Sequence, residues 1–146
     1  MRITLEIRRT LDLEALPTRR RLFLYRLWAR VRFQLTSGWS EPHVAIVDTG
    51  APYSVIPASL SPPLRTERLK QVPLRGIVPG KAAEVEAVLA RVHTRLLDAR
   101  TTSPRLSLWA MLVNTDHMPL ILGWAGCLDR AKLTLDAQRN TAWLEF

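Results

Sequence analysis

Apolar and polar residues alternate with period two in several stretches of the chain, which is the pattern of a strand with one buried face. The alternation is clearest in residues 3–8, 31–35, 132–136 and 141–146. Nearly continuous apolar runs cover residues 43–47, 53–57 and 106–113, as expected for strands that are buried more fully. Turn residues separate these stretches. The pattern therefore predicts a mainly β protein.

Two segments depart from this pattern. After Pro17, apolar residues recur at three-to-four spacing, which predicts a short helix over about residues 18–29. Residues 81–97 fit both a helical face and a strand, so their sequence alone leaves the choice open. A single helical turn fits between residues 126 and 130.

One carboxylate stands at the end of an apolar strand, immediately before a glycine turn, in the segment Ile46-Val47-Asp48-Thr49-Gly50-Ala51. Residues 31–47 read as a hairpin that leads to it. Gly50 lets the chain turn where a side chain would crowd the site, and its amide can donate to the Asp48 carboxylate. Farther on, Leu120-Ile121-Leu122-Gly123 repeats the apolar-apolar-Gly element without a second Asp-Thr-Gly. One chain therefore supplies one such aspartate.

Residues 31–146 resemble the retroviral-type (retropepsin-like) aspartic proteases and their single-domain cellular and bacterial relatives. The resemblance rests on Asp48-Thr49-Gly50-Ala51, on Tyr53-Ser54-Val55-Ile56-Pro57 and on Ile121-Leu122-Gly123. It implies a closed β-barrel half-site that dimerises. Asp48 would be catalytic, supported by Thr49, Gly50 and Ala51, and Ile121, Leu122 and Gly123 would pack under the site.

The resemblance also assigns roles to the segments around the site. Residues 71–83 would form a flap over the substrate, with the binding residues Gly76, Ile77, Val78, Pro79 and Gly80. The long strands that the family needs after the flap favour a strand over residues 81–97. The chain ends would interleave between subunits, which makes Thr49, Trp143 and Phe146 interface residues. After Ile121-Leu122-Gly123 the family usually has a polar residue, often Arg, where this chain has Trp124.

Two carboxylates a few ångströms apart cannot both ionise readily, so such a pair shares a proton and titrates as a unit. The ionised member can take a proton from water while the protonated member donates a hydrogen bond to a peptide carbonyl. The expected activity is a homodimeric aspartic endopeptidase, with a peptide or protein substrate and no cofactor.

The 146 residues suit one compact unit, with 47% apolar and 23% charged residues. We divide the chain into an N-terminal strand and basic extension, residues 1–30, and a protease domain, residues 31–146. No apolar run reaches the length of a membrane span, and the N-terminus lacks a signal-peptide layout, so we expect a soluble, cytoplasmic protein.

The net charge of +8 is concentrated near the N-terminus, where residues 1–40 hold nine arginines and three acidic residues. Residues 19–30 mix arginines with aromatic residues, a composition that suits contact with nucleic acid or an anionic membrane. An amphipathic packing segment with a solvated basic face is the favoured interpretation. An alternative function follows: an inactive retropepsin-fold dimer that acts as a binding or scaffold module through this Arg-rich segment.

The remaining reactive residues offer little chemistry. Cys127 is the single cysteine, which excludes an internal disulfide, and its expected place is a small buried apolar site. His43, His93 and His117 are scattered without metal-ligand spacing. No metal site is expected.

Overall fold

The computed structural model describes residues 1–13, 22–74 and 85–146. Eleven strands form one mixed sheet, and the described residues contain no α-helix, only a 3-10 turn over Leu128–Arg130. The strands are β1 (Arg2–Leu11), β2 (Phe23–Leu35), β3 (Gly38–Trp39), β4 (His43–Val47), β5 (Ser54–Ile56), β6 (Thr66–Leu74), β7 (Val85–Leu97), β8 (Leu106–Val113), β9 (Ile121–Leu122), β10 (Lys132–Asp136) and β11 (Thr141–Glu145). The predicted mainly β class is confirmed.

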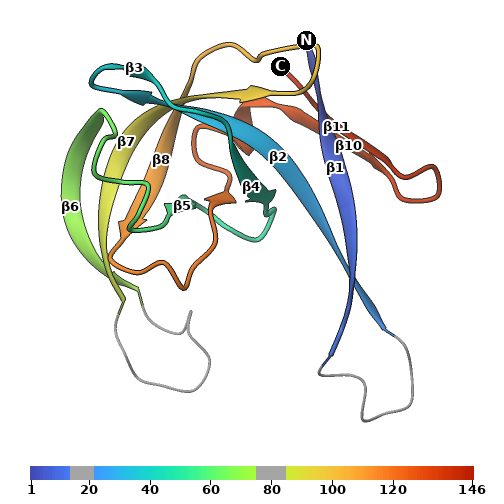
Figure 1. Cartoon of the computed structure of the whole chain (residues 1–146), viewed down its shortest axis with the longest axis horizontal. Helices are drawn as coiled ribbons and strands as arrows, with labels where there is room; N and C mark the ends of the chain where they lie inside the picture. The colour runs from blue at the N-terminus through green and yellow to red at the C-terminus, as the bar shows by residue number, and fades with distance from the viewer. Residues whose placement is uncertain (14–21, 75–84) are drawn as a thin grey trace.

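The strand order is β10-β11-β1-β2-β4-β9-β5-β8-β7-β6, with β3 paired to β2. An additional pairing of β2 with β7 links β2, β4, β9, β5, β8 and β7 into a partial ring of six strands. Figure 1 shows this curved body, with β10 and β11 leaving it beside the two chain ends. The sheet thus curves around a core, and β1, β10, β11 and β6 lie outside the partial ring.

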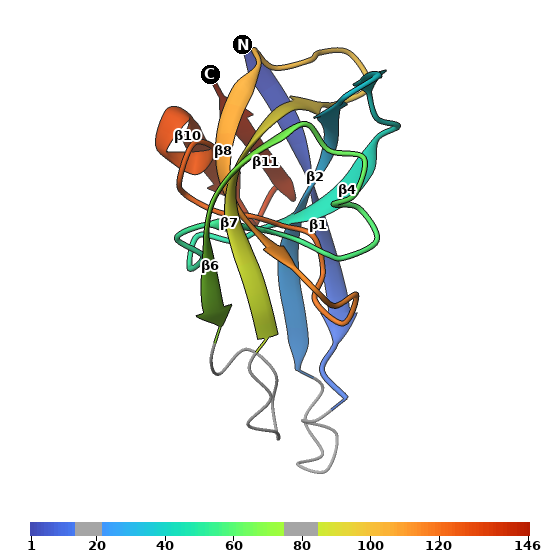
Figure 2. The same cartoon turned by 90° about the vertical axis from the view of Figure 1, so that its left-hand side faces the viewer.

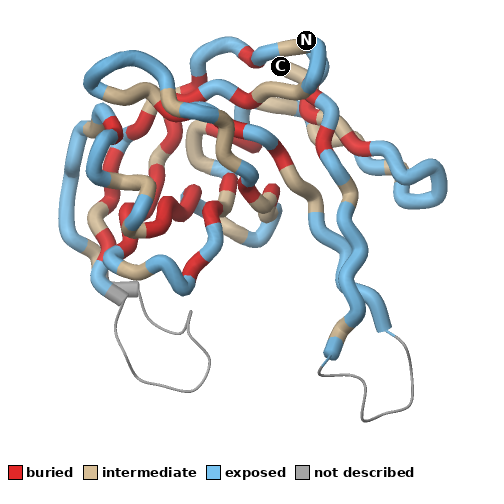
Figure 3. Tube along the Cα trace, in the orientation of Figure 1, coloured by how far each residue is buried: buried red, intermediate tan, exposed pale blue. Residues whose placement is uncertain are grey.

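Alternating burial explains why these sequences form strands. In β1, Ile3 and Leu5 are buried while their neighbours are exposed, and β2 buries Ala29, Val31 and Phe33 in the same way. These side chains belong to the main hydrophobic cluster, which extends to β11 through Leu144. A smaller cluster, centred on Val55, Met111 and Val113, lies beside β5 and β8. In Figure 3 the buried segments lie inside the curved body.

The predicted helix over residues 18–29 is wrong where the structure describes it. Residues 23–29 belong to β2, which pairs with β1 on one side and with β4 on the other. The apolar spacing looked helical because Leu24, Leu27 and Trp28 do not share one face of the strand. Backbone pairing with β1, and from Leu27 onward also with β4, outweighs this local pattern. Residues 18–21 lie outside the described residues.

Other element predictions are confirmed. The open segment 81–97 is a strand from Val85 onward, and the helical turn after Ile121-Leu122-Gly123 is present as Leu128–Arg130. The strands expected at residues 43–47, 106–113 and 132–136 have the expected bounds. β2 continues without a break through residue 30, where we divided the chain.

Two pairs of strands extend from the same side of the body. These are the ends of β1 and β2 that face residues 14–21 and the ends of β6 and β7 that face residues 75–84, and the two views in Figures 1 and 2 agree on their direction. β6 and β7 pair in antiparallel fashion from Thr66 opposite Val92 to Leu74 opposite Val85. The flap residues Gly76, Ile77, Val78, Pro79 and Gly80 lie outside the described residues.

Candidate active site

Asp48 directly follows β4, and backbone pairing with β9 fixes its position. β9 lies between β4 and β5, parallel to β4 and antiparallel to β5. The Asp48 amide donates to the Leu122 carbonyl at 3.0 Å, which continues the bond from the Ile46 amide to the Leu120 carbonyl at 2.9 Å. The Ile-Leu-Gly element therefore holds the end of β4, although seventy residues separate the two in sequence.

The turn after Asp48 orients its carboxylate. The Gly50 amide donates to Asp48 Oδ1 at 2.8 Å, and the Ala51 amide approaches the Asp48 carbonyl oxygen at 3.3 Å. A Cβ at position 50 would lie 3.2 Å from the same Oδ1 atom, so glycine allows the close approach. Asp48 is half-buried, whereas Thr49 and Gly50 are exposed. The carboxylate is thus held on one side and open to solvent on another.

Gly123, which directly follows β9, packs closely against the backbone of the segment after Asp48. A Cβ on Gly123 would lie 2.5 Å from the Tyr53 carbonyl oxygen and 2.6 Å from that of Ala51. The next two amides, of Trp124 and Ala125, donate to the carbonyls of Ala51 and Pro52 at 2.9 and 3.0 Å. No side chain fits at position 123, which gives a physical reason for the glycine in this motif.

Ser54 is a support residue to which our sequence analysis gave no role. Its side chain is fully buried, and its Oγ accepts a hydrogen bond from the Gly123 amide at 3.1 Å. A buried amide without a partner is costly, so this hydroxyl stabilises the junction of β5 and β9. A small polar residue next to the apolar pair Val55-Ile56 was the available signal.

Trp124 contacts the Asp48 turn from the position where the resemblance implies a polar residue. Its Nε1 donates to the Thr49 carbonyl at 2.6 Å, while 45% of the residue remains exposed. The Thr49 hydroxyl itself bonds to no described residue. The indole thus braces the turn, which the sequence did not indicate.

The structure brings together most of the residues that we selected from the sequence. Asp48, Thr49, Gly50 and Ala51 form the turn, and it lies directly against β9. Leu122 and Gly123 are buried beside it, and Ile121 is half-buried against the smaller hydrophobic cluster. The flap residues cannot be placed relative to this turn.

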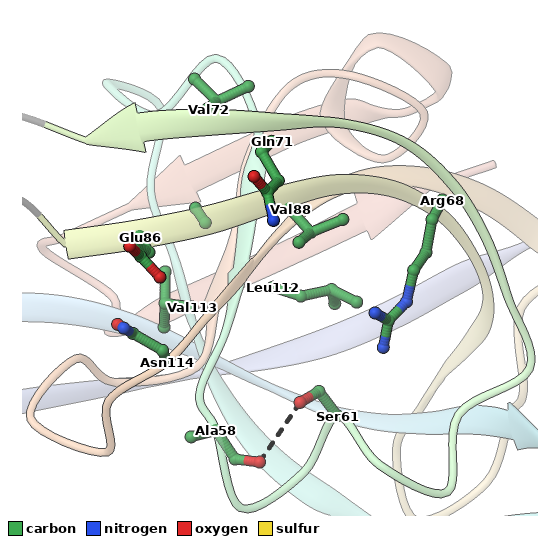
Figure 4. A pocket seen from close by; sticks show the side chains of 11 residues that line it. Ala58, Ser61, Arg68, Gln71, Val72, Glu86, Val88, Leu112, Val113 and Asn114 are labelled. Atoms are coloured by element: carbon green, nitrogen blue, oxygen red, sulfur yellow. Dashed lines mark hydrogen bonds between the residues drawn. The ribbon is translucent and has the colours of Figure 1, made fainter.

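A cavity of about 400 Å³ lies between four segments of the chain. These are β6, the first residues of β7, the last residues of β8 and the segment after β5. Figure 4 shows Arg68 and Glu86 at this cavity, with Leu112 and Val88 between them. The Ser61 hydroxyl donates to the Ala58 carbonyl at 3.2 Å on one wall. Asp48 does not line this cavity, so the cavity is not the candidate active site.

Trp143 and Phe146, our expected interface residues, lie far along the sheet from Asp48. Trp143 is in β11, which pairs with β10 on one side and β1 on the other. The Arg2 guanidinium lies 5.0 Å from the Trp143 ring centroid, and the Phe146 amide donates to the Met1 carbonyl at 2.9 Å. For β11 to pair with a strand of a second subunit, its pairing with β1 or with β10 would first have to open. The interface role of Trp143 and Phe146 stays a prediction.

The remaining chemistry of the described residues is limited. Burial raises the pKa of the Cys127 thiol to about 12, so the thiol is protonated near neutral pH and is a poor nucleophile. The described part of the chain contains no group of three His, Cys, Asp or Glu side chains arranged to hold a metal ion. No helix in that part is long and apolar enough to cross a membrane.

Comparison of the chain with protein-family models, with curated proteins and with solved structures finds no match.

Proposed function

We propose that the chain is one subunit of a homodimeric, retropepsin-like aspartic endopeptidase. The observation that carries the proposal is the Asp48 turn, in which the Gly50 amide orients a half-buried carboxylate at the end of a strand. A turn-capping aspartate would need no further support. Here the turn is also held by β9, by the Gly123 contact and by the Trp124 indole, as expected for a carboxylate whose position matters.

The proposed mechanism uses two copies of Asp48. One carboxylate is ionised and removes a proton from water as the water oxygen bonds to the scissile carbonyl carbon. The other is protonated and donates to the carbonyl oxygen, which gives a tetrahedral diol. The C–N bond then breaks as the carboxyl proton of one Asp48 moves to the leaving nitrogen. A hydroxyl proton of the diol returns to the other Asp48 carboxylate, so the diol becomes a carboxylic acid and the pair again shares one proton.

The surrounding residues would position the substrate and the pair. Gly50 keeps each carboxylate in the plane of its turn, and Thr49 is exposed where it can meet the partner subunit. The half-buried Ile121 lies beside the turn and would contact substrate. We therefore expect apolar residues on both sides of the cleaved bond.

The test is cleavage of a diverse peptide mixture, followed by mass spectrometry from about pH 4 to pH 7. Asp48→Asn removes the titratable oxygen but keeps the shape, so we expect cleavage to fall at least about a thousandfold. Asp136→Asn is the matched control, because this carboxylate lies on β10 and bonds to the Arg139 amide. Equal cleavage by wild type and Asp48→Asn would refute the proposal.

A binding or scaffold dimer is the second candidate. It is supported by the exposed aromatic and basic residues at the ends of β1 and β2, where Tyr25 is 63% exposed. Such a protein would leave every peptide intact and would keep its partner affinity in Asp48→Asn. The same peptide experiment therefore separates the two candidates.

A further inference from the structure

The ends of β1 and β2 form a two-stranded ribbon, with no third strand beside it among the described residues. We call residues 8–11 of β1 and residues 23–26 of β2 the β1–β2 arm. The strands pair from Arg8 opposite Arg26 to Leu11 opposite Phe23. β4 ends at Val47, opposite Leu27, so along the arm no described strand pairs with the other side of β2. In Figure 1 the arm leaves the body below β4.

One face of the arm continues the side of the sheet that packs against the main hydrophobic cluster. Ile7 and Leu27 face each other and pack against the main cluster, and the next pairs on that face are Arg9 with Tyr25 and Leu11 with Phe23. Leu11, Phe23 and Tyr25 are all exposed. In Figure 3 most of the arm has the pale blue of exposed residues. The Arg9 guanidinium lies 4.3 Å from the Phe23 ring centroid. The arm thus presents an apolar face with one stacked cation.

A ribbon with this composition is poorly suited to exposure in water. Two-stranded ribbons without a packed face are marginally stable, and clustered apolar side chains on a surface usually mark an interface. Tyr, Phe and Arg are also residues enriched in protein interfaces. The arm therefore has the composition of a contact element.

The position of Asp48 indicates what covers the arm. β4 runs toward the end of the arm and Asp48 follows its last residue, so the candidate catalytic turn lies at the base of the arm. Beyond Leu27 the four further residues of β2 extend about 13 Å at about 3.3 Å per residue. A two-fold axis that places two Asp48 side chains a few ångströms apart would run past this base. Each arm would then start close enough to the axis to reach the other subunit.

We propose that the β1–β2 arm grips a second copy of this chain and carries much of the dimer interface; this inference rests on the proposed two-Asp48 site. Its occupant is the body of the partner rather than the partner's arm, because the arm carries Arg9 and Arg26 and no acidic residue, while Arg8 is paired with Glu6 beside the arm. Two such arms in contact would repel each other. The apolar face, with Arg9 stacked on Phe23, meets the partner, and Arg8 and Arg26 lie on the opposite face of the arm.

The test measures dimer dissociation by analytical ultracentrifugation for wild type and for the double variant Phe23→Ser/Tyr25→Ser. Both side chains are exposed in one chain, so the variant keeps its fold, which circular dichroism checks. We expect its dissociation constant to rise by roughly a hundredfold or more, since each aromatic contact occurs twice in a two-fold dimer. Leu135→Ser is the control, because Leu135 is equally exposed but lies on β10. It should dissociate like wild type.

A second measurement does not depend on the tolerance of the arm to substitution. A photocrosslinking phenylalanine analogue replaces Tyr25, and isotopically heavy and light subunits are mixed before irradiation. Crosslinks between heavy and light chains that join the arm to the partner's body support the proposal. Crosslinks confined to one chain, a wild type that stays monomeric, or a double variant that dimerises like wild type would each overturn it.

These readouts also separate the arm from the proteolytic activity. If wild type is a dimer that the double variant loses, but no peptide is cleaved, the arm inference stands and the endopeptidase proposal fails. If peptides are cleaved through Asp48 and the double variant remains fully dimeric, the endopeptidase stands and the arm inference fails.

Discussion

Asp98 shows how one carboxylate can hold two distant parts of this chain together. It lies just after β7 and accepts hydrogen bonds from the backbone amides of Thr4 at 2.8 Å, Arg100 at 2.8 Å and Thr101 at 2.7 Å. These bonds, that from Thr4 first, lower the pKa of the Asp98 carboxyl from its ordinary value. The interaction ties β1 to the connection between β7 and β8, outside the candidate active site.

We predict that Asp98→Ala lowers the free energy of unfolding by about 1–3 kcal/mol at pH 7, because three amides lose a charged acceptor. Since the folded-state pKa is depressed, the contribution is complete above the unfolded value near 4 and disappears as the pH falls through the folded value. Urea unfolding of wild type and variant at several pH values measures this difference. Glu67→Ala, at an exposed surface pair with Arg91, should change little.

A difference between wild type and Asp98→Ala that stays constant far below the unfolded pKa would contradict this assignment. It would show that the lost stability comes from the side-chain volume and not from the ionised carboxylate.

At the residue scale, the sequence was sufficient to select the Asp48 turn and its support by residues 121–123, but not the supports from Ser54 and Trp124. Asp48 and Gly50 lie within a few residues of each other, so their hydrogen bond follows from local geometry. Ser54 and Trp124 act through contacts with residues far away in the sequence. One sequence alone does not specify which distant carbonyl or amide a side chain will meet.

At the scale of elements, β9 organises the candidate site although it contains only two residues. Its neighbours β4 and β5 follow each other in the chain, yet β9 separates them and supports the Asp48 turn from below. The close approach of Gly123 to two carbonyls is the tightest point of this junction.

We predict that Gly123→Ala displaces the Asp48 turn, because the added Cβ would overlap the backbone oxygens of Ala51 and Tyr53. The free energy of unfolding should fall by about 2–4 kcal/mol and cleavage should be lost. Thermal unfolding and the peptide assay measure the two effects. Gly38→Ala is the control: its φ of 135° makes alanine strained, but nothing lies within 4 Å of its Cβ and Asp48 is not involved.

The Gly38→Ala control should therefore be less stable than wild type but retain cleavage when it is assayed well below its melting temperature. A Gly123→Ala protein that is as stable and as active as wild type would show that the turn can shift without consequence.

Strands with a clear apolar run or a strict alternation were predictable, and long strands with mixed patterns were not. The apolar run of β8 and the alternation of β10 predicted the observed bounds of these strands. The helix prediction failed in β2 because Phe23 and Leu24 lie on opposite faces of its exposed end. No single buried face therefore shows the period of a strand there. β7 was resolved only by the resemblance, since helical and strand periods both fit its residues.

At the scale of the molecule, one chain provides a single Asp48, held on a strand end beside the β1–β2 arm. β11, whose Trp143 we expected at the interface, already has partners on both sides within the chain. The mainly β architecture followed from the alternation of apolar residues. The alternation did not predict the β2 to β7 pairing, which joins strands that are distant in sequence. The resemblance implied a closed barrel, whereas the described strands form a partial ring of six.

The central claim is that two chains each contribute one Asp48 to a single site. The most direct measurement mixes a fixed amount of wild type with increasing amounts of Asp48→Asn, allows the subunits to exchange, and records peptide cleavage per wild-type subunit. At a ninefold excess, about one tenth of the wild-type subunits retain a wild-type partner, so cleavage per wild-type subunit should fall to about one tenth. An excess of Asp136→Asn should not lower it. Cleavage per wild-type subunit that stays constant as Asp48→Asn is added would show that each chain acts alone, and would contradict the account.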